Sequence, residues 1–130
     1  MPVRAKELRY AVDLAADGEL RDENGVVLDV PAEWSPEHLL LAALVRCSID
    51  GFAHHARRAG HSVTAAGSAH GTITKSGEDE RYRFVDIEVQ IDAQLQPRSD
   101  EPDVLVAKAE RDCFVGASLA VKPRYTWRVS

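Results

Sequence analysis

Apolar and polar residues alternate along three segments of the chain, with the period of two that is typical of half-buried β-strands. These segments are 8–14, 84–91 and 121–129. The sequences at 22–25 (Asp-Glu-Asn-Gly) and 77–80 (Gly-Glu-Asp-Glu) are typical of tight turns. They predict two further strands, 26–30 and 62–74, each joined to a neighbouring strand through one of these turns.

A helical period replaces the strand period over residues 36–59. Ser35 is a suitable N-cap, Pro36 suits the first helical position, and Glu37 complements the positive end of the helix. Gly60 predicts its end. Residues at steps of three and four lie near one face: Leu40, Ala43, Leu44, Cys47, Gly51 and His54. Because the other faces are also largely apolar, we expect this helix to be buried at the centre, against a copy of itself.

Two shorter helices, 104–111 and 113–119, are expected before the last strand. The order of strands, long helix, strand hairpin, short helices and strand predicts an α+β fold, with antiparallel sheets packed on the central apolar helix. At 130 residues, the chain is expected to form one domain spanning 1–130. The apolar central helix favours a homodimer.

The charge narrows the classes of function. A formal net charge of -5 argues against a nucleic-acid partner and against an anionic membrane, since both attract a basic surface. The first residues lack the apolar run of a signal peptide, and no stretch approaches the ~20 apolar residues of a membrane span. We therefore expect a cytoplasmic protein.

The chain contains two cysteines, Cys47 within the long helical pattern and Cys113 after a charged helical segment. In a reducing compartment, so few cysteines are redox-active or incidental rather than a disulfide scaffold. Two thiols held by ordered elements can cycle between dithiol and disulfide, and that chemistry reduces peroxides.

These segments resemble the signatures of the OsmC/Ohr family of thiol-dependent peroxidases. The first signature is a helix that opens with Pro-Glu and continues through Leu/Ala-rich turns to a cysteine, here residues 36–47. The second is a cysteine that opens a short helix after a charged one, here residues 113–119. The resemblance covers most of the chain, and the spacing of the cysteines is similar. It implies an OsmC-like fold and an intertwined homodimer with two active sites near the subunit interface.

The resemblance also implies a role for each thiol. Cys47 attacks the O–O bond of an organic hydroperoxide or hydrogen peroxide and becomes a sulfenic acid, and Cys113 resolves it as an intrachain disulfide. A dithiol reductant, lipoyl-type in some family members, resets the pair by exchange. No metal and no organic cofactor is implied.

Two more residues are candidates for this site. Glu37 matches the family's glutamate by position. Since ten residues of straight helix span about 15 Å, we expect Glu37 to serve Cys47 of the partner subunit. The family's activating arginine has no clean counterpart, because Ala16 lies near its position and Phe114 replaces a common proline in the second signature. Arg21 is the nearest arginine and the candidate cation.

Each candidate has a plainer alternative. Cys47 and Cys113 are also suited to packing, because free cysteine is often buried. Glu37 is also a common first-turn charge, and Arg21 a solvated hairpin charge. His54 and His55 diverge on a helix and cannot easily share a metal ion. The rival function is a non-catalytic OsmC-like dimer that binds a small apolar ligand or senses redox state.

Overall fold

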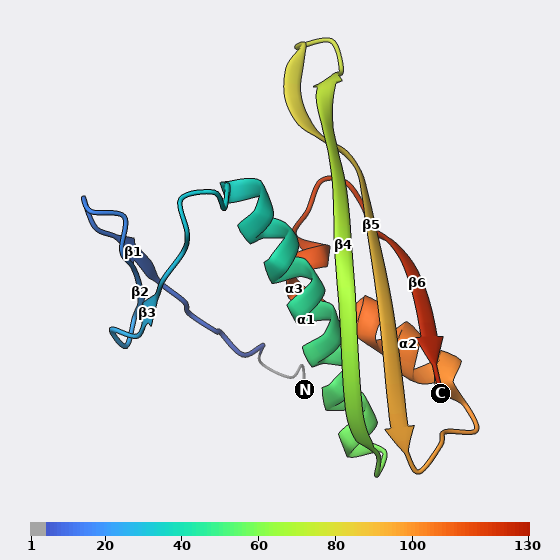
Figure 1. The fold of residues 1–130 in the computed structure, drawn as a ribbon. Helices are drawn as coiled ribbons and strands as arrows, with labels where there is room; N and C mark the ends of the chain where they lie inside the picture. Colours follow the sequence, from blue (N-terminus) through green and yellow to red (C-terminus); the bar gives the residue numbers. More distant parts are fainter. Residues whose placement is uncertain (1–4) are drawn as a thin grey trace. The chain divides into compact units, whose positions relative to one another are not determined.

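The computed structural model describes residues 5–130, and the chain divides into two compact units, Met1–Ser35 and Pro36–Ser130 (Figure 1). The first unit contains only short strands, and the second contains the helices and a larger sheet. The predicted α+β class is confirmed. Among the described residues, no helix is long and apolar enough to cross a membrane.

The first unit is an antiparallel meander of three strands, β1 (Val12–Leu14), β2 (Leu20–Asp22) and β3 (Val27–Leu28). The sequence missed β2 and predicted too long a first strand, because Leu8 and Tyr10 are exposed and unpaired in the meander. The turn at 22–25 is confirmed. Gly25 has φ +80°, a conformation that glycine adopts without strain.

The second unit begins with α1 (Pro36–Arg58), close to the predicted helix. Gly60, with φ +92°, follows it, and its N–H donates to the carbonyl of Arg57. The buried face is formed by Leu44, Ser48, Phe52, Ala53 and Ala56. The predicted buried face was therefore wrong in its position around the helix axis, because two of its members, Ala43 and His54, are exposed.

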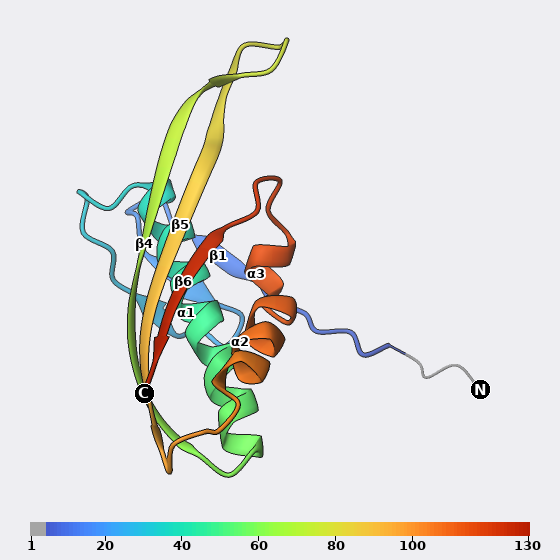
Figure 2. The ribbon, with the colours of Figure 1, turned by 90° about the vertical axis from the view of Figure 1, so that its right-hand side faces the viewer.

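The sheet of this unit has the order β4 (Ser62–Ser76), β5 (Arg81–Gln96) and β6 (Arg124–Val129). The long hairpin of β4 and β5 is antiparallel, as predicted, but β6 pairs with β5 in parallel. The chain leaves the end of β5, passes through two helices and returns to the opposite end of the sheet before β6 begins. Because of this crossover connection, β6 runs in the same direction as β5. Figure 2 shows α1 and the two later helices on the same face of this sheet.

The core lies between this sheet face and α1. Alternate residues of β5 point into it and are buried: Ile87, Val89, Ile91, Ala93 and Leu95. The predicted alternation fails at Val85, which is 37% exposed. A register shift between Thr72 and Ile73 leaves Val85 without a pairing partner, so that Phe84 packs against the core instead.

The two later helices are α2 (Pro102–Arg111) and α3 (Phe114–Ala117). The first begins two residues earlier than predicted, because Pro102 occupies its first turn. The second is shorter than predicted, and Cys113 is its N-cap rather than its first helical residue. This placement fixes the position of one of the two thiols.

Candidate thiol site

Cys113 lies at the junction between α2 and α3 and points into the core beside α1. Its side chain is almost completely buried, with 1% exposure, among Leu44, Ile87 and other apolar side chains. As the N-cap of α3, its sulfur accepts a hydrogen bond from the backbone N–H of Gly116, at 3.4 Å. A polar group from its own segment therefore faces the sulfur.

Two hydroxyl groups from other elements meet at the same sulfur. Ser48 Oγ of α1 lies 3.6 Å from Cys113 Sγ and 3.0 Å from the Tyr125 hydroxyl of β6. The Ser48 hydroxyl also donates to the carbonyl of Leu44, at 2.9 Å. Helix, helix junction and strand thus contribute one polar group each to a small network inside an apolar core.

Cys47 lies next to this network, and the structure brings the two predicted thiols together. The Cys47 side chain packs against the buried cluster that contains Cys113, each thiol acts on the pKa of the other, and both are free thiols. The backbone N–H groups of Phe114 and Val115 act to lower the pKa of Cys47. Cys47 is half-buried, whereas Cys113 is enclosed, so the pair has one accessible and one inaccessible member.

The surroundings act on the two thiols in opposite directions. Burial raises the pKa of Cys47; the backbone N–H of Val115 and, more weakly, that of Phe114 oppose this rise, and the neighbouring Cys113 adds to it. Burial also acts to raise the pKa of Cys113. There, however, the Gly116 N–H, the hydroxyls of Ser48 and Tyr125 and the Cys47 thiol outweigh it, so its pKa is lowered. Cys113 is the more acidic thiol.

The other two candidates belong to different elements. Glu37 is in the first turn of α1, and the helix is unbroken to Cys47, so about 15 Å of helix axis separates them within one chain. Arg21 lies in β2 of the first unit, where its guanidinium pairs with Glu19 at 2.6 Å. Within residues 36–130, burial, backbone N–H groups and Cys113 set the pKa of Cys47, and none of these is a basic side chain.

Charged side chains hold the junction that carries Cys113. The Asp112 carboxylate accepts from Arg111 Nε at 2.8 Å and lies 2.8 Å from His55 Nε2 of α1. The Arg111 guanidinium, with burial opposing it and His55 assisting, lowers the pKa of Asp112. The Asp112 carboxylate therefore links the last turn of α1 to the junction that carries Cys113. Within the described chain, no group of three or more His, Cys, Asp or Glu side chains is placed to hold a metal ion.

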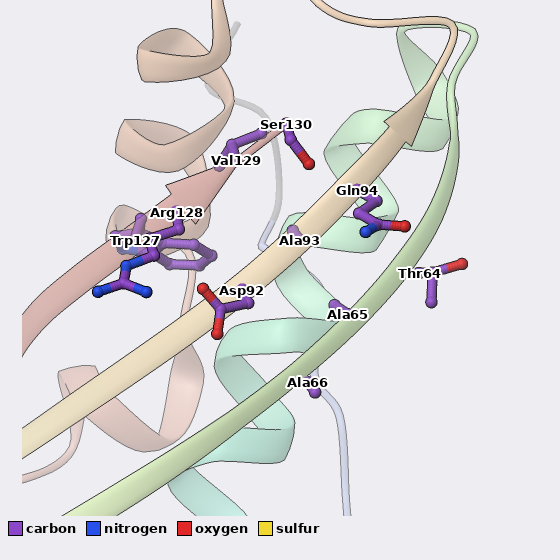
Figure 3. A pocket seen from close by; sticks show the side chains of 10 residues that line it. All are labelled: Thr64, Ala65, Ala66, Asp92, Ala93, Gln94, Trp127, Arg128, Val129 and Ser130. Carbon is purple, nitrogen blue, oxygen red and sulfur yellow. The ribbon is translucent and has the colours of Figure 1, made fainter.

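Two surface depressions lie near the second sheet. The larger one is on the outer face of β4, β5 and β6, where Asp92 and Arg128 project, and neither thiol lines it (Figure 3). The other lies over α2, α3 and the start of β6, and Gly116 and Tyr125 are in its lining with the basic residues Arg111 and Lys122. Of these two depressions, the second borders the network around Cys113.

Ser48 and Tyr125 were missed by the sequence analysis. A signal for Ser48 was available, since it is a polar residue four positions after Leu44 in an apolar helix. Tyr125 belongs to the inward-facing set of the last strand, where its ring packs as an apolar side chain and hides the role of its hydroxyl. The sequence could not show that these two hydroxyls meet at Cys113.

Comparison with known proteins now adds to this geometry. The family described as OsmC-like protein matches residues 30–128. An OsmC-like protein of unknown function from Vibrio cholerae has a TM-score of 0.75 and 16% identity, over 95% of this chain and 99% of that one. An OsmC-like protein from Mycoplasma pneumoniae has a TM-score of 0.70 and 14% identity, over 97% and 99%.

An organic hydroperoxide resistance protein from Elizabethkingia anophelis is also similar, with a TM-score of 0.68 and 17% identity, over 98% of this chain and 100% of that one. At these identities the likeness shows a shared fold. No curated protein matches the chain significantly.

Proposed function

The chain belongs to the OsmC-like protein family, and from this premise we propose that it is a thiol-dependent peroxidase that reduces organic hydroperoxides or hydrogen peroxide. The observation that carries the proposal is that the two thiols of one subunit belong to one apolar cluster, in which each acts on the pKa of the other. Some structural relatives are named organic hydroperoxide resistance proteins, which supports the same chemistry.

In the proposed cycle, the accessible Cys47 thiolate attacks one oxygen of the peroxide. The O–O bond breaks, an alcohol or water leaves after protonation, and Cys47 becomes a sulfenic acid. The Cys113 thiolate then attacks the Cys47 sulfur and expels hydroxide, which is protonated to water. A dithiol reductant, such as a lipoyl-type group, reduces the disulfide to the two thiols by exchange and becomes a disulfide itself.

The reacting thiol needs help that the described surroundings of Cys47 do not supply, because its pKa is raised by burial. We assign this help to Arg21, whose positive charge would favour the thiolate. We assign Glu37 to the site of the partner subunit in a homodimer, since the unbroken α1 keeps it from Cys47 of its own chain. Both assignments are tested by variants below.

Steady-state turnover tests the proposal. Reduced protein is mixed with cumene hydroperoxide and dihydrolipoamide, and peroxide consumption is followed with and without protein. We expect consumption above the uncatalysed rate that is lost in Cys47→Ser and reduced to a single turnover in Cys113→Ser. A wild-type rate equal to that of Cys47→Ser contradicts the proposed peroxidase.

A second candidate function is a redox sensor without turnover, and one observation favours it. Within residues 36–130, the groups that act on Cys47 include no basic side chain, so this unit by itself supplies no cation that would speed the attack of Cys47 on peroxide. A sensor forms the Cys47–Cys113 disulfide with a mild oxidant such as diamide, yet shows no catalytic consumption of peroxide. The turnover assay separates the two functions.

A further inference from the structure

We propose that Ser48 and Tyr125 are positioning residues that hold the Cys113 sulfur as the leaving group of a Cys47–Cys113 disulfide, so that the reductant attacks the sulfur of Cys47. The inference rests on the proposed function, because it concerns the step that resets the thiol pair. It assigns a task to two residues of α1 and β6 that the proposed cycle does not otherwise use.

The burial of Ser48 is the first argument. Ser48 is 1% exposed and is the one polar side chain that is fully buried among residues 5–130. Burying a hydroxyl costs free energy unless hydrogen bonds replace its contacts with water. The contacts that replace them here are the Leu44 carbonyl, the Tyr125 hydroxyl and the Cys113 sulfur, and packing alone would be served better by alanine.

The second argument concerns the single hydrogen that the Ser48 hydroxyl can donate. A serine hydroxyl has one hydrogen to donate and two lone pairs to accept with. While Cys113 is a neutral thiol, the Ser48 hydroxyl donates its hydrogen to the Leu44 carbonyl. That carbonyl also accepts the ordinary helical hydrogen bond from the backbone N–H four residues later. When Cys113 carries a negative charge, the hydroxyl can rotate toward the sulfur 3.6 Å away without leaving that carbonyl unpaired.

Tyr125 keeps a donor in place throughout. Burial raises the pKa of Tyr125 to about 12, with the hydroxyl of Ser48 opposing and Cys113 assisting, so the phenol stays protonated at neutral pH. Its hydroxyl lies 3.0 Å from Ser48 Oγ and also acts on the Cys113 sulfur. The Ser48 hydroxyl and the Gly116 N–H are then the two donors to the negatively charged sulfur, and the Tyr125 hydroxyl, by donating to Ser48 Oγ, leaves the Ser48 hydrogen free for that sulfur.

Access to the two sulfurs then fixes the direction of reduction. Cys113 is 1% exposed and Cys47 is half-buried, so an incoming thiolate reaches Cys47. The reductant sulfur bonds to Cys47, the Cys47–Cys113 bond breaks, and its electron pair leaves with Cys113 as a thiolate. The second thiol of the reductant then displaces Cys47. A leaving sulfur with a lower pKa leaves faster, and the lowered pKa of Cys113 supports this order.

A titration without peroxide tests the proposal. In the Cys47→Ser background, absorbance at 240 nm reports ionisation of Cys113 once the tyrosine signal, measured in the Cys47→Ser/Cys113→Ser double variant, is subtracted. We expect Tyr125→Phe and Ser48→Ala each to move the midpoint to higher pH by about one pH unit, a tenfold change in the thiol–thiolate equilibrium. The matched variants Tyr82→Phe and Ser68→Ala, at exposed positions of the β4–β5 hairpin, should leave it unchanged.

Unchanged midpoints in Tyr125→Phe and Ser48→Ala overturn the proposal. Circular dichroism establishes that each variant is folded, and Ser48→Ala decides alone if Tyr125→Phe does not fold. A shifted midpoint in a protein that lacks peroxide turnover would defeat the proposed peroxidase and leave the role of the hydroxyls standing, so the two failures are distinguishable.

Trapping with a monothiol tests the direction of attack. The disulfide is formed with diamide, glutathione is added, and the reaction is quenched with acid before peptide mapping. We expect the glutathione adduct on Cys47, formed about tenfold more slowly in Tyr125→Phe and Ser48→Ala than in the two matched variants. An adduct on Cys113, or equal rates in all variants, contradicts the proposal.

Discussion

The hydroxyl oxygen of Ser48 lies 3.6 Å from the sulfur of Cys113, although 65 positions separate the two residues in the sequence. Ser48 follows Cys47 on α1, and the Cys47 side chain packs against the same buried cluster as Cys113. The distance depends on how the α2–α3 junction packs on α1. The packing of that junction is therefore as important to the proposed chemistry as the two cysteines themselves.

Arg21 is the candidate that activates Cys47, and replacing it tests the assignment. Loss of a nearby positive charge raises the pKa of a thiol, and each unit lowers its thiolate fraction about tenfold at neutral pH. We expect Arg21→Ala to slow the oxidation of Cys47 by peroxide tenfold or more, measured by stopped-flow fluorescence. Arg9→Ala, at another exposed arginine that pairs with Glu7, is the matched control. Equal rates in the two variants would remove Arg21 from the site.

Glu37 is assigned to the partner's site, and mixed dimers test whether it acts across the subunit interface. Neither Cys47→Ser nor Glu37→Gln homodimers should turn over peroxide at the wild-type rate. In a mixed dimer, the subunit with an intact Cys47 faces the intact Glu37 of the other subunit, so activity should return when the two variants are refolded together. No recovery, in a mixture shown by mass spectrometry to contain mixed dimers, contradicts action across the interface.

The sequence predicted the elements whose start and end signals lie within a few residues. It did not predict features that depend on packing between distant segments. Capping at Ser35-Pro36-Glu37 and the stop at Gly60 predicted α1 because they act within one turn of the helix. The face of α1 was misjudged, because an apolar helix leaves its rotation to be set by the sheet and by α2. The parallel pairing of β6 likewise follows from the crossover rather than from its own alternation.

The same distinction holds for the candidate site. The family signatures singled out Cys47 and Cys113, and the structure places both side chains in one apolar cluster. Ser48 and Tyr125 have no such signature, because their roles arise from tertiary packing that brings α1 and β6 to one sulfur. The assignments of Arg21 and Glu37 stay predictions.

Close packing around Gly67 on β4 leaves no room for a larger side chain, so we expect its replacement to destabilise the protein. A Cβ at this position would lie 2.8 Å from the carbonyl oxygen of Gln90 and 3.0 Å from a methyl group of Val45. We expect Gly67→Ala to lower the free energy of unfolding by about 1–3 kcal/mol, measured by urea denaturation. Gly51→Ala is the control, since its Cβ would meet nothing closer than 3.7 Å and alanine favours the helix. Equal stability of both variants contradicts this packing.

Asp112 gives a prediction about pH. Its pKa is lowered from the ordinary 3.8, chiefly by Arg111 and further by His55. A carboxylate whose pKa is lower in the folded state stabilises the protein above its unfolded pKa, and this contribution is lost as the pH falls through the folded value. Asp112→Asn should therefore lower Tm at pH 7, with a difference from wild type that shrinks below about pH 4. Asp29→Asn, at an exposed position, is the control. A difference that is constant with pH contradicts the assignment.

The most direct test of the thiol cycle is the intact mass of the reduced protein after brief exposure to stoichiometric cumene hydroperoxide. We predict rapid loss of two hydrogens in the wild type, no such loss in Cys47→Ser or Cys113→Ser, and a dimedone adduct on Cys47 in Cys113→Ser. That result establishes a sulfenic acid on Cys47 that Cys113 resolves. A wild-type mass that stays unchanged on this timescale, with both thiols still free, would contradict the proposed peroxidase.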